Sequence, residues 1–526
     1  MARRVGMAAF QATQVAGAGI LAVLSLASPA FGALTISSAA TQDMSCSAGV
    51  CAPTATDAVL NATDLENLLA SGNLTVTTTG SGGVQAGDIE VEARFDWSGA
   101  SGLVLDAYRS IAIDKAISVD GLSSLSILTD DGGSGGTLSF GRKGNIAFAN
   151  LSSRLAINGT SYTLVDKVAR LASAVAADPS GTYAFANSYD AEKDGTYTQS
   201  PIPTTFEGTL EGLGNTISNV TIADTQSGGY GGFFSEIDTP ATVRDLRLED
   251  VGISGVAGDV GGLAGRSYGT AYGDSVSGTI EADRGGDIGG LIGYGGGLAE
   301  DCSASVDLTR TKVGGEEGGL VGSFGGSISN SSATGQVSTG NYSIAGGLVG
   351  YYDVGVISGS FASGAVSGGH KAQLGGLVGF TENEENAAIE NSYSTGAVTG
   401  GKASVVGGLV GHSDYDRDSN NSMSSSYSAG AVSGKSLAFA GGLIGYDNNA
   451  PDGCGCFTDL YWDTTTSGIK KRSRGAGNIA NDPGITGLSN KEFRSGLPAG
   501  FDPSVWAEDK TINNGLPYLI ANPPPK

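Results

Sequence analysis

The string Gly346-Gly347-Leu348-Val349-Gly350 decides the fold, because it is one of seven copies of Gly-Gly-Leu-x-Gly in which x is Ala, Val or Ile. The copies begin at Gly261, Gly289, Gly318, Gly346, Gly375, Gly407 and Gly441. Successive copies start 28, 29, 28, 29, 32 and 34 residues apart, and a degenerate copy begins at Gly231. Such a period, with glycine at fixed places, is typical of one coil of a β-solenoid.

A second string marks the part of the repeat whose length is constant. It reads Phe361-Ala362-Ser363-Gly364-Ala365-Val366 in one coil, and its relatives begin at Ser332, Tyr393 and Tyr427. The first residue of each lies 15 positions before the second glycine of the next Gly-Gly-Leu string. The other part of the repeat varies from 13 to 19 residues, so we expect insertions on one side of the solenoid only.

These patterns predict an all-β fold, a parallel β-helix or β-solenoid with three short strands in each coil of about 29 residues. Glycine should provide positive φ at the corners and let neighbouring backbones approach closely. Four aromatic residues, Phe361, Tyr393, Tyr427 and Tyr461, should stack as a column inside the core. Ile389 shares strand parity with Tyr393, which favours an inward tyrosine.

The first half of the chain predicts less regular coils and two short helices. Residues 89–97 alternate between apolar and polar side chains, as in a strand with one buried face. A capping box at 63–66 predicts a helix that ends at Gly72, and an apolar face formed by residues 164, 168, 171 and 175 predicts a second one. We expect residues 33–72 and 485–526 to cover the two open ends of the solenoid.

Five segments follow: a signal peptide at 1–32, an N-terminal cap at 33–72, an irregular β-helix at 73–222 with a short helix near 164–177, the repeat array at 223–468, and a C-terminal cap and tail at 469–526.

The leader and the cysteines predict export. Arg3 and Arg4 precede an apolar stretch at 15–26, and Ala30-Phe31-Gly32 provides a small-residue cleavage site, which is the order found in secretory signal peptides. No later segment is long enough to span a membrane. In an exported chain Cys46 and Cys51 are expected to form a local disulfide. Cys454 and Cys456 could pair only in a small ring, and Cys302 is left over.

Charge and composition exclude several functions. The chain of 526 residues has 29 Lys and Arg against 53 Asp and Glu, a net charge of −24, so nucleic acid is not an expected partner. Its two histidines, His370 and His412, are 42 residues apart and are expected in exposed turns. A zinc-binding His-Glu-x-x-His string is absent and a histidine-based catalytic triad is not expected, so we name no catalytic residue and no cofactor.

Two loops in the variable part of the repeat are the candidates for contact with a partner, Glu382–Asn386 and Asp414–Asn421. Asp414, Asp416 and Asp418 alternate like the first ligands of a calcium loop, but the glycine and glutamate of the full pattern are absent. They are a weak calcium candidate, with an ordinary solvated loop as the alternative.

The strings at 346–350, 375–379 and 407–411 resemble the GLUG-motif repeat of exported bacterial proteins. Residues 69–78 and 206–217 are similar to the stalk of filamentous-haemagglutinin-type adhesins, although the two-partner secretion domain of those adhesins has no counterpart here. The resemblance implies a Gram-negative surface or secreted adhesin-like protein, not an enzyme, whose rigid solenoid presents loops to a glycan or protein on a host or neighbouring cell. The alternatives are a polysaccharide-degrading β-helix enzyme and a passive envelope component. We expect a monomer, and a periplasmic location stays open.

Overall fold

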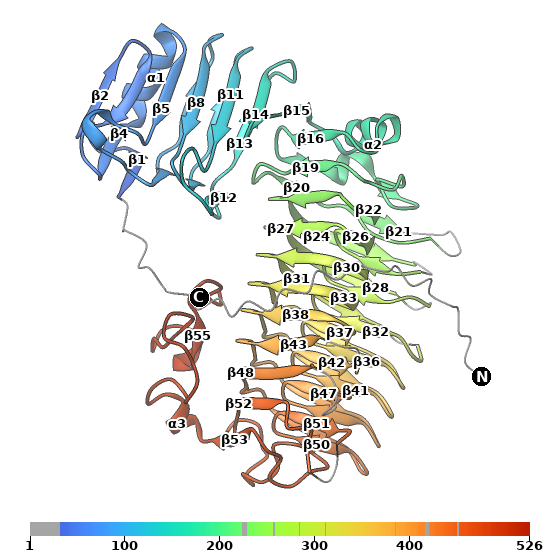
Figure 1. Ribbon diagram of the computed structural model, residues 1–526. Helices are drawn as coiled ribbons and strands as arrows, with labels where there is room; N and C mark the ends of the chain where they lie inside the picture. Colours follow the sequence, from blue (N-terminus) through green and yellow to red (C-terminus); the bar gives the residue numbers. More distant parts are fainter. Residues whose placement is uncertain are drawn as a thin grey trace.

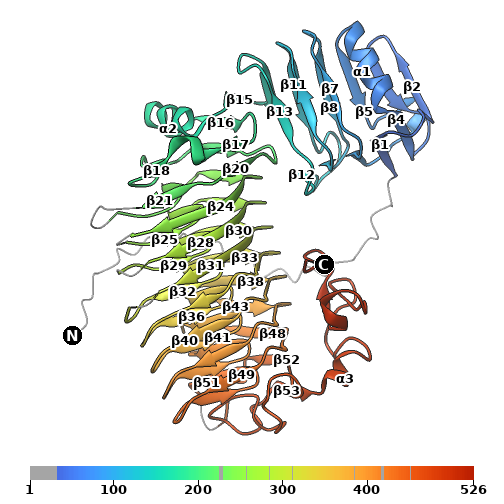
Figure 2. The same ribbon diagram turned by 180° about the vertical axis from the view of Figure 1, so that it is seen from behind.

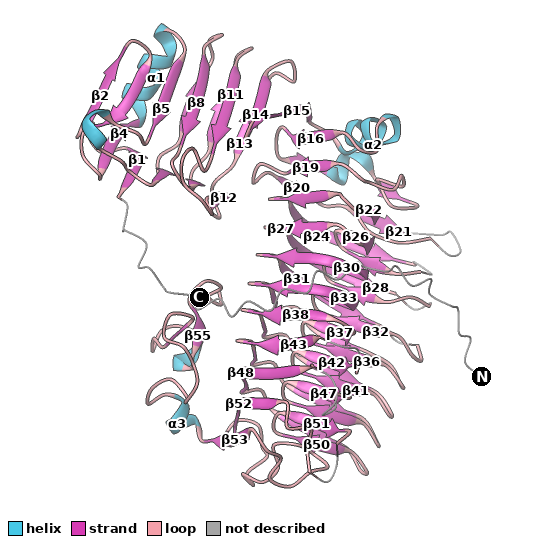
Figure 3. Cartoon of the chain, in the orientation of Figure 1, coloured by secondary structure: helices cyan, strands magenta, loops and turns pink. Residues whose placement is uncertain are grey.

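The computed structural model describes residues 32–223, 229–255, 258–282, 285–310, 312–383, 386–415, 420–449 and 452–525. Stacked coils of short, mostly parallel strands form a β-solenoid, which confirms the expected fold class (Figure 1, Figure 3). The described residues also form three α-helices, α1 (Ala62–Ser71), α2 (Val168–Ala177) and α3 (Asn490–Phe493). The expected signal peptide lies outside the described residues except for Gly32.

Residues 33–157 form a separate stack with three sheets, tilted against the longer stack that follows (Figure 1). Ile89 lies beside Ile111, 22 residues later, so these coils are shorter than those of the array. The sheets consist of β4 (Ala58–Asn61), β1 (Ala33–Ser37), β6 (Asp88–Val91), β9 (Ile111–Ile113) and β12 (Leu138–Phe140); β7 (Phe95–Trp97), β10 (Ile117–Val119) and β13 (Ile146–Phe148); and β2 (Met44–Ser47), β3 (Val50–Pro53), β5 (Leu74–Thr77), β8 (Gly102–Asp106), β11 (Ser124–Leu128) and β14 (Arg154–Ile157).

Both helices of the first half form, with boundaries that differ from those expected. The N-cap of α1 is Asn61, whose side chain accepts hydrogen bonds from the N–H groups of Thr63 and Asp64, so the helix begins before the expected capping box. Leu164 belongs to β15 (Thr160–Val165), and α2 starts only at Val168. Most buried residues up to Leu164, together with Ala184, Ala186 and Leu213, form one core cluster, and Val165 belongs with most of the later buried residues to a second one.

The repeat array has between three and five short strands per coil: β29 (Ile288–Gly289), β30 (Ile292–Glu300) and β31 (Ser303–Thr309) form a coil with the expected three, and other coils are divided further. One coil consists of β36 (Ile344–Gly346), β37 (Val349–Tyr352), β38 (Gly355–Ser358), β39 (Phe361–Ala362) and β40 (Val366–Gly368). Two tight corners per coil, one in the Gly-Gly-Leu string and one at a residue with positive φ, divide the chain more finely than the hydrophobic pattern predicts. The positive-φ corner is occupied by Asp301, Asn330, Gly359, Asn391, Ser425 and Asp459 in successive coils.

The glycines of the Gly-Gly-Leu string have ordinary backbone angles, contrary to the expected positive φ. They are required by close approach. A Cβ on Gly347 would overlap the carbonyl oxygen of Gly376 in the next coil and lie 2.8 Å from the Cβ of Ala362. A Cβ on Gly350 would lie 2.7 Å from the backbone nitrogen of Glu317 in the preceding coil.

Two stacks of strands meet at this corner. The strand before the string belongs to a seven-stranded sheet, here called the short sheet, of β25 (Val260–Gly261), β29 (Ile288–Gly289), β32 (Glu316–Gly318), β36, β41 (Gln373–Gly375), β46 (Val405–Gly407) and β50 (Phe439–Gly441). The strand after the string belongs to the stack of β26 (Ala264–Ser267), β30 (Ile292–Glu300), β33 (Val321–Ser329), β37, β42 (Val378–Thr381), β47 (Val410–Ser413) and β51 (Ile444–Asp447).

A column of buried serines lies inside the solenoid after the positive-φ corner. The hydroxyl of Ser392 accepts a hydrogen bond from the N–H of Ser360 at 3.3 Å and donates to the carbonyl of Glu390 at 2.8 Å. Ser331, Ser360 and Ser426 repeat this pattern of contacts, and Cys302 stands at the head of the column. The column satisfies backbone groups that the corners leave without a partner in their own strand.

In the expected column Phe361, Tyr393 and Tyr427 stack, with ring centroids 5.0 Å apart for the first pair and 5.1 Å for the second, and Tyr461 lies on the next rung with its ring 5.7 Å from that of Phe501. The column faces outward, however, and not into the core. Asn391 has φ 45°, so the corner resets the strand parity between Ile389 and Tyr393. The small side chains of Ala362 and Ser394 point inward in its place.

The C-terminal segment, residues 489–525, covers this column. After β52 (Phe457–Asp463) and the last rung β53 (Ile485–Leu488), the chain turns back and runs along the side of the solenoid through α3, β54 (Trp506–Ala507) and β55 (Tyr518–Leu519) (Figure 2). The segment therefore covers one side of the array. The sequence had led us to expect that it covers the open end.

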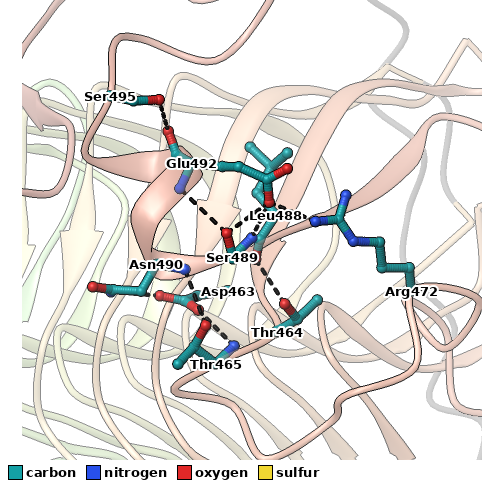
Figure 4. Close-up of polar contacts among 9 residues, drawn as sticks. All are labelled: Asp463, Thr464, Thr465, Arg472, Leu488, Ser489, Asn490, Glu492 and Ser495. Carbon is teal, nitrogen blue, oxygen red and sulfur yellow. Dashed lines mark hydrogen bonds and ion pairs between the residues drawn. The ribbon is translucent and has the colours of Figure 1, made fainter.

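Polar contacts attach the start of this segment to the last rungs (Figure 4). Ser489 and Glu492 form a capping box at α3, and Glu492 also accepts from Arg472 at 2.5 Å. Asn490 donates to Asp463 at 2.7 Å.

Apolar contacts hold the rest of the segment. Trp506 lies 5.9 Å from the rings of both Tyr393 and Tyr427 and 4.5 Å from Phe501. The Tyr427 hydroxyl donates to the carbonyl of Pro517 at 2.6 Å. These contacts make the covered column a second core outside the solenoid.

Candidate functional site

Each Gly-Gly-Leu-x-Gly string brings together two outward side chains that lie seven positions apart in the sequence. One lies two positions before the first glycine of the string, and the other directly follows its last glycine. Phe439 and Tyr446 flank one string in this way, with ring centroids 5.3 Å apart. The strings therefore build two adjacent outward columns along the array.

The column that follows the strings is rich in aromatic residues and is open to solvent. Tyr351 and Phe380 stack at 5.3 Å, and His412 lies 4.9 Å from Phe380 and 5.0 Å from Tyr446. In successive coils the column reads Arg266, Tyr294, Ser323, Tyr351, Phe380, His412 and Tyr446.

His412 is therefore a half-buried strand residue rather than the expected exposed turn residue. Its Nδ1 lies 2.7 Å from Oε1 of Gln373, and burial lowers the pKa of its imidazole. His370, in contrast, lies in a turn as expected.

The column that precedes the strings is acidic in its first three coils, where it consists of Asp259, Asp287 and Glu316. The Oδ1 atom of Asp259 accepts from the N–H of Asp287 at 3.1 Å. Burial, followed by repulsion from Glu316 and Asp259, raises the pKa of Asp287 to about 8. Burial also raises the pKa of Glu316 and of Asp259. Three carboxyl groups on neighbouring rungs thus share a partly desolvated surface.

A groove of about 660 Å³ opens where the acidic and aromatic columns meet. Its lining includes Asp287, Glu316, Tyr268, Tyr294, Tyr351 and Asp353, together with the glycines at 295–297. Arg266 lies beside it, 5.6 Å from the ring of Tyr268 and 5.3 Å from that of Tyr294.

The groove offers flat aromatic faces beside groups that donate and accept hydrogen bonds. Aromatic faces stack on apolar surfaces such as the CH face of a sugar ring. A carboxyl that is protonated near neutral pH, such as that of Asp287, can donate a hydrogen bond as well as accept one. This combination suits a polyhydroxylated ligand.

The loops expected to contact partners lie at the next corner, between the open strand stack and the strands that follow it. Their bases are joined from coil to coil. Asn421 donates to Asn383 at 3.3 Å and accepts from the N–H of Ala387 at 2.7 Å. Asn448 of the following coil donates to Asp414. The described parts of the two candidate loops, which leave out residues 384–385 and 416–419, are thus connected to each other and to the loop of the next coil.

Of the weak calcium candidates, only Asp414 falls within the described residues, while Asp416 and Asp418 lie outside them. The described part of the chain has no group of three or more His, Cys, Asp or Glu side chains placed to hold a metal ion. The calcium site thus stays a prediction.

The cysteines lie away from the groove. Cys46 and Cys51 form a disulfide across the hairpin of β2 and β3. Cys454 and Cys456 are also joined, although such a small ring was not favoured from the sequence. Cys302 is a buried free thiol.

Comparison with known proteins agrees with the repeat. The family model of the GLUG motif matches residues 372–399. The array is built from GLUG repeats. A stretch of 78 residues is 38% identical to halomucin of Haloquadratum walsbyi (strain DSM 16790 / HBSQ001), covering 15% of this chain and 1% of halomucin. A solved structure of IgA1 protease matches 49% of this chain and 21% of its own, with 25% identity and a TM-score of 0.41.

The chain thus spans a small part of the length of either protein. No helix in the described ranges is long and apolar enough to cross a membrane.

The groove residues were not singled out from the sequence, although the GLUG strings carried the signal. The two side chains that meet outside the corner lie two positions before the first glycine of each string and directly after its last glycine. The acids of the first three strings and the aromatic residues after the strings could have been found by aligning the copies on these flanking positions.

Proposed function

We propose that this protein is exported and acts as an adhesin-like display protein, with the groove as a glycan-binding site. The observation that carries the proposal is the groove itself, in which Tyr268, Tyr294 and Tyr351 line the same cavity as Asp287 and Glu316.

A rigid solenoid suits this role because its binding residues need no ordering when a ligand arrives. The aromatic rings are already stacked on their neighbours, which reduces the entropy lost on binding. A column that crosses several rungs can also contact several units of a linear glycan at once, and such multivalent contacts compensate for weak single ones.

The binding part of the proposal is tested on a glycan array with the purified chain and the double variant Tyr294→Ala/Tyr351→Ala. Binding should fall at least about fivefold, because two stacking surfaces are lost. Tyr446→Ala is the matched comparison, since Tyr446 belongs to the same column but not to the groove lining, and its loss should weaken binding less than the double variant does. Equal binding by the double variant would reject the groove as the site.

The location is tested by treating intact cells with a protease and following the protein by immunoblot, with a periplasmic protein as the leakage control. Loss of the signal with the control intact supports surface display. Full protection would contradict it and favour a periplasmic role.

A second function, hydrolysis of a polysaccharide, is favoured by one observation. Asp287 and Glu316 occupy equivalent positions on neighbouring rungs and line the same groove, so a pair of carboxyl groups faces the ligand, as in glycosidases. The raised pKa of Asp287 would suit a general acid. Release of reducing ends from a bound glycan, lost in Asp287→Asn, would support hydrolysis, and binding without release would reject it.

A further inference from the structure

One corner of the array is positively charged although the chain as a whole is strongly acidic. It connects β40 to β41, β45 (Val398–Gly400) to β46, and β49 (Val432–Gly434) to β50. Lys371, Lys402 and Lys435 lie at this corner in three successive coils, and all three side chains are exposed. We call these three lysines, with His370 and Tyr342, the basic corner.

Backbone hydrogen bonds fix the register of this corner. The N–H of Tyr342 donates to the carbonyl of His370 at 2.9 Å, and that of Lys371 donates to the carbonyl of Lys402 at 3.0 Å. The N–H of Lys435 donates to the carbonyl of Gly400 at 3.2 Å. The three lysines therefore lie on successive rungs, about 4.8 Å apart at ordinary strand spacing, and each occupies a position one residue earlier in the corner than the lysine before it.

Few negative charges oppose this row. The corner segments 339–343, 368–372, 400–404 and 434–438 contain neither Asp nor Glu. The ion pairs among the described residues do not involve the three lysines. At physiological salt a charge is screened beyond about 8 Å, so a ligand at this corner senses the lysines more than the distant acids.

An aromatic surface begins the row. Tyr342 is 53% exposed, its ring lies 5.4 Å from that of His370, and Nζ of Lys371 lies 5.6 Å from its centroid. The Nδ1 atom of His370 lies 2.8 Å from the carbonyl oxygen of Lys402, which holds the imidazole against the corner.

We propose that the basic corner binds a linear acidic polysaccharide with one carboxylate on each sugar unit. One cation per rung matches a polymer with one charge per sugar, and Tyr342 can stack on a sugar ring at the start of the row. The surface is an edge rather than a cavity, which fits a chain that lies along it. Duplex DNA fits poorly, because it carries one charge per about 1.7 Å and needs a much denser row of cations.

This site is separate from the groove, because the short sheet lies between the two corners. The variant Lys371→Glu/Lys402→Glu/Lys435→Glu tests it without changing a groove residue. The control is Lys115→Glu/Lys143→Glu/Lys193→Glu, which reverses three exposed lysines of the first half and gives the same net charge.

The full chain is titrated with polygalacturonate at low and at physiological salt, with neutral dextran as the uncharged polymer. We expect salt-sensitive binding of polygalacturonate only, weakened about tenfold or more in the basic-corner variant, because three attractive contacts become repulsive. The control variant should lose less than about twofold, since its charges lie far beyond the screening length.

Equal losses in both variants, equal binding of dextran, or no binding of polygalacturonate at low salt would overturn the proposal. Competition by duplex DNA as strong as that by polygalacturonate would also overturn it, in favour of a nucleic acid. Sedimentation of the same variants tests whether a second copy of the chain occupies the corner instead. A dimer that dissociates only in the basic-corner variant, without polysaccharide binding, would assign the corner to a second copy of the chain.

Discussion

The array carries two outward aromatic columns that differ in whether another part of the chain covers them. Rings in the covered column stack 5.0 and 5.1 Å apart. Rings in the open column lie 5.3, 4.9 and 5.0 Å apart, almost the same spacing. Yet Tyr393 and Tyr427 are fully buried, whereas Tyr351, Phe380 and Tyr446 are half exposed.

The comparison shows that the spacing of the rings and their burial have different causes. The ring spacing follows from the rung spacing, which both columns share, although the rings at His412 meet their neighbours edge-on. Whether a column becomes core or surface depends on the C-terminal segment, which covers one side of the array and leaves the other side open. We therefore regard the covered column as structural and the open column as available to a ligand, and four changes test this distinction.

The largest effect is expected from Trp506→Ala, which should uncover the covered column. Trp506 is 1% exposed, and its Nε1 donates to Asn391 at 3.2 Å. Loss of such a buried side chain costs about 3–5 kcal/mol. Limited proteolysis should then remove the C-terminal segment quickly, and urea denaturation followed by circular dichroism should show the loss of stability.

Tyr446→Ala is the matched change in the open column. Its half-exposed ring should contribute less than about 1 kcal/mol, which is the contribution of a single stacked pair. If both variants lose the same stability, the open column is as structural as the covered one and the comparison fails.

A smaller effect is expected from Gly347→Ala, which should disturb both columns at once. Gly347 lies two residues before Val349 of β37, near Tyr351, and its added Cβ would crowd Ala362, the neighbour of Phe361. Crowding of this kind costs about 1–3 kcal/mol. Gly252→Ala is the control, because a Cβ there has nothing within 4 Å. If the two variants have the same thermal stability, the close approach of neighbouring coils is not the reason why glycine recurs at this position of the strings.

The fold class could be predicted from the sequence because the cause is local. A backbone that passes within contact distance of the next coil requires glycine at fixed positions, and a fixed period of glycine is visible without a structure. The extra strand breaks of some coils could not be predicted in the same way, since Gly359 and Asn391 interrupt strands at corners that the hydrophobic pattern does not mark.

The sequence did not show which of the two columns the C-terminal segment covers. The positive φ of Asn391 reverses the direction of Tyr393, and its cover lies about a hundred residues later in the chain. The groove also depends on the stacking of coils, which brings Asp287 beside Glu316 and Tyr294 near Tyr351. The loops at 382–386 and 414–421 could be located from their variable length, but their ligand could not, because length carries no chemistry.

A change of pH should act through the carboxyl groups of the interior and the open side. The pKa of Asp287 is raised to about 8, and those of Asp245, Glu317 and Asp482 to about 7, in each case chiefly by burial. The folded chain therefore binds these protons more tightly than the unfolded chain. This contribution to stability is fully present below about pH 4 and is lost as the pH rises through 7 to 8.

The melting temperature should accordingly be a few degrees higher at pH 5 than at pH 8. Asp482→Asn should reduce this difference, because Asp482 is nearly fully buried beside Asp447. Asp502→Asn is the control, since Asp502 is exposed and hydrogen bonds from Ser504 lower its pKa. A melting temperature that rises from pH 5 to pH 8 would contradict the sign.

The smallest effect is expected from Ser392→Ala, which tests whether the serine column supports the covered rings from behind. The change leaves the N–H of Ser360 without its side-chain acceptor and the carbonyl of Glu390 without its hydroxyl donor. A buried group that loses its partner costs about 1–3 kcal/mol, and the low end applies here because the carbonyl retains a second lone pair. Ser363→Ala, at an exposed position of the same arc, should be neutral in urea denaturation.

Since Ser392 precedes Tyr393 directly, the loss of its hydroxyl should also speed proteolytic removal of the C-terminal segment while leaving glycan binding at the groove unchanged. Loss of glycan binding instead would mean that the two sides of the array are coupled, and that the covered column cannot be treated as structural alone.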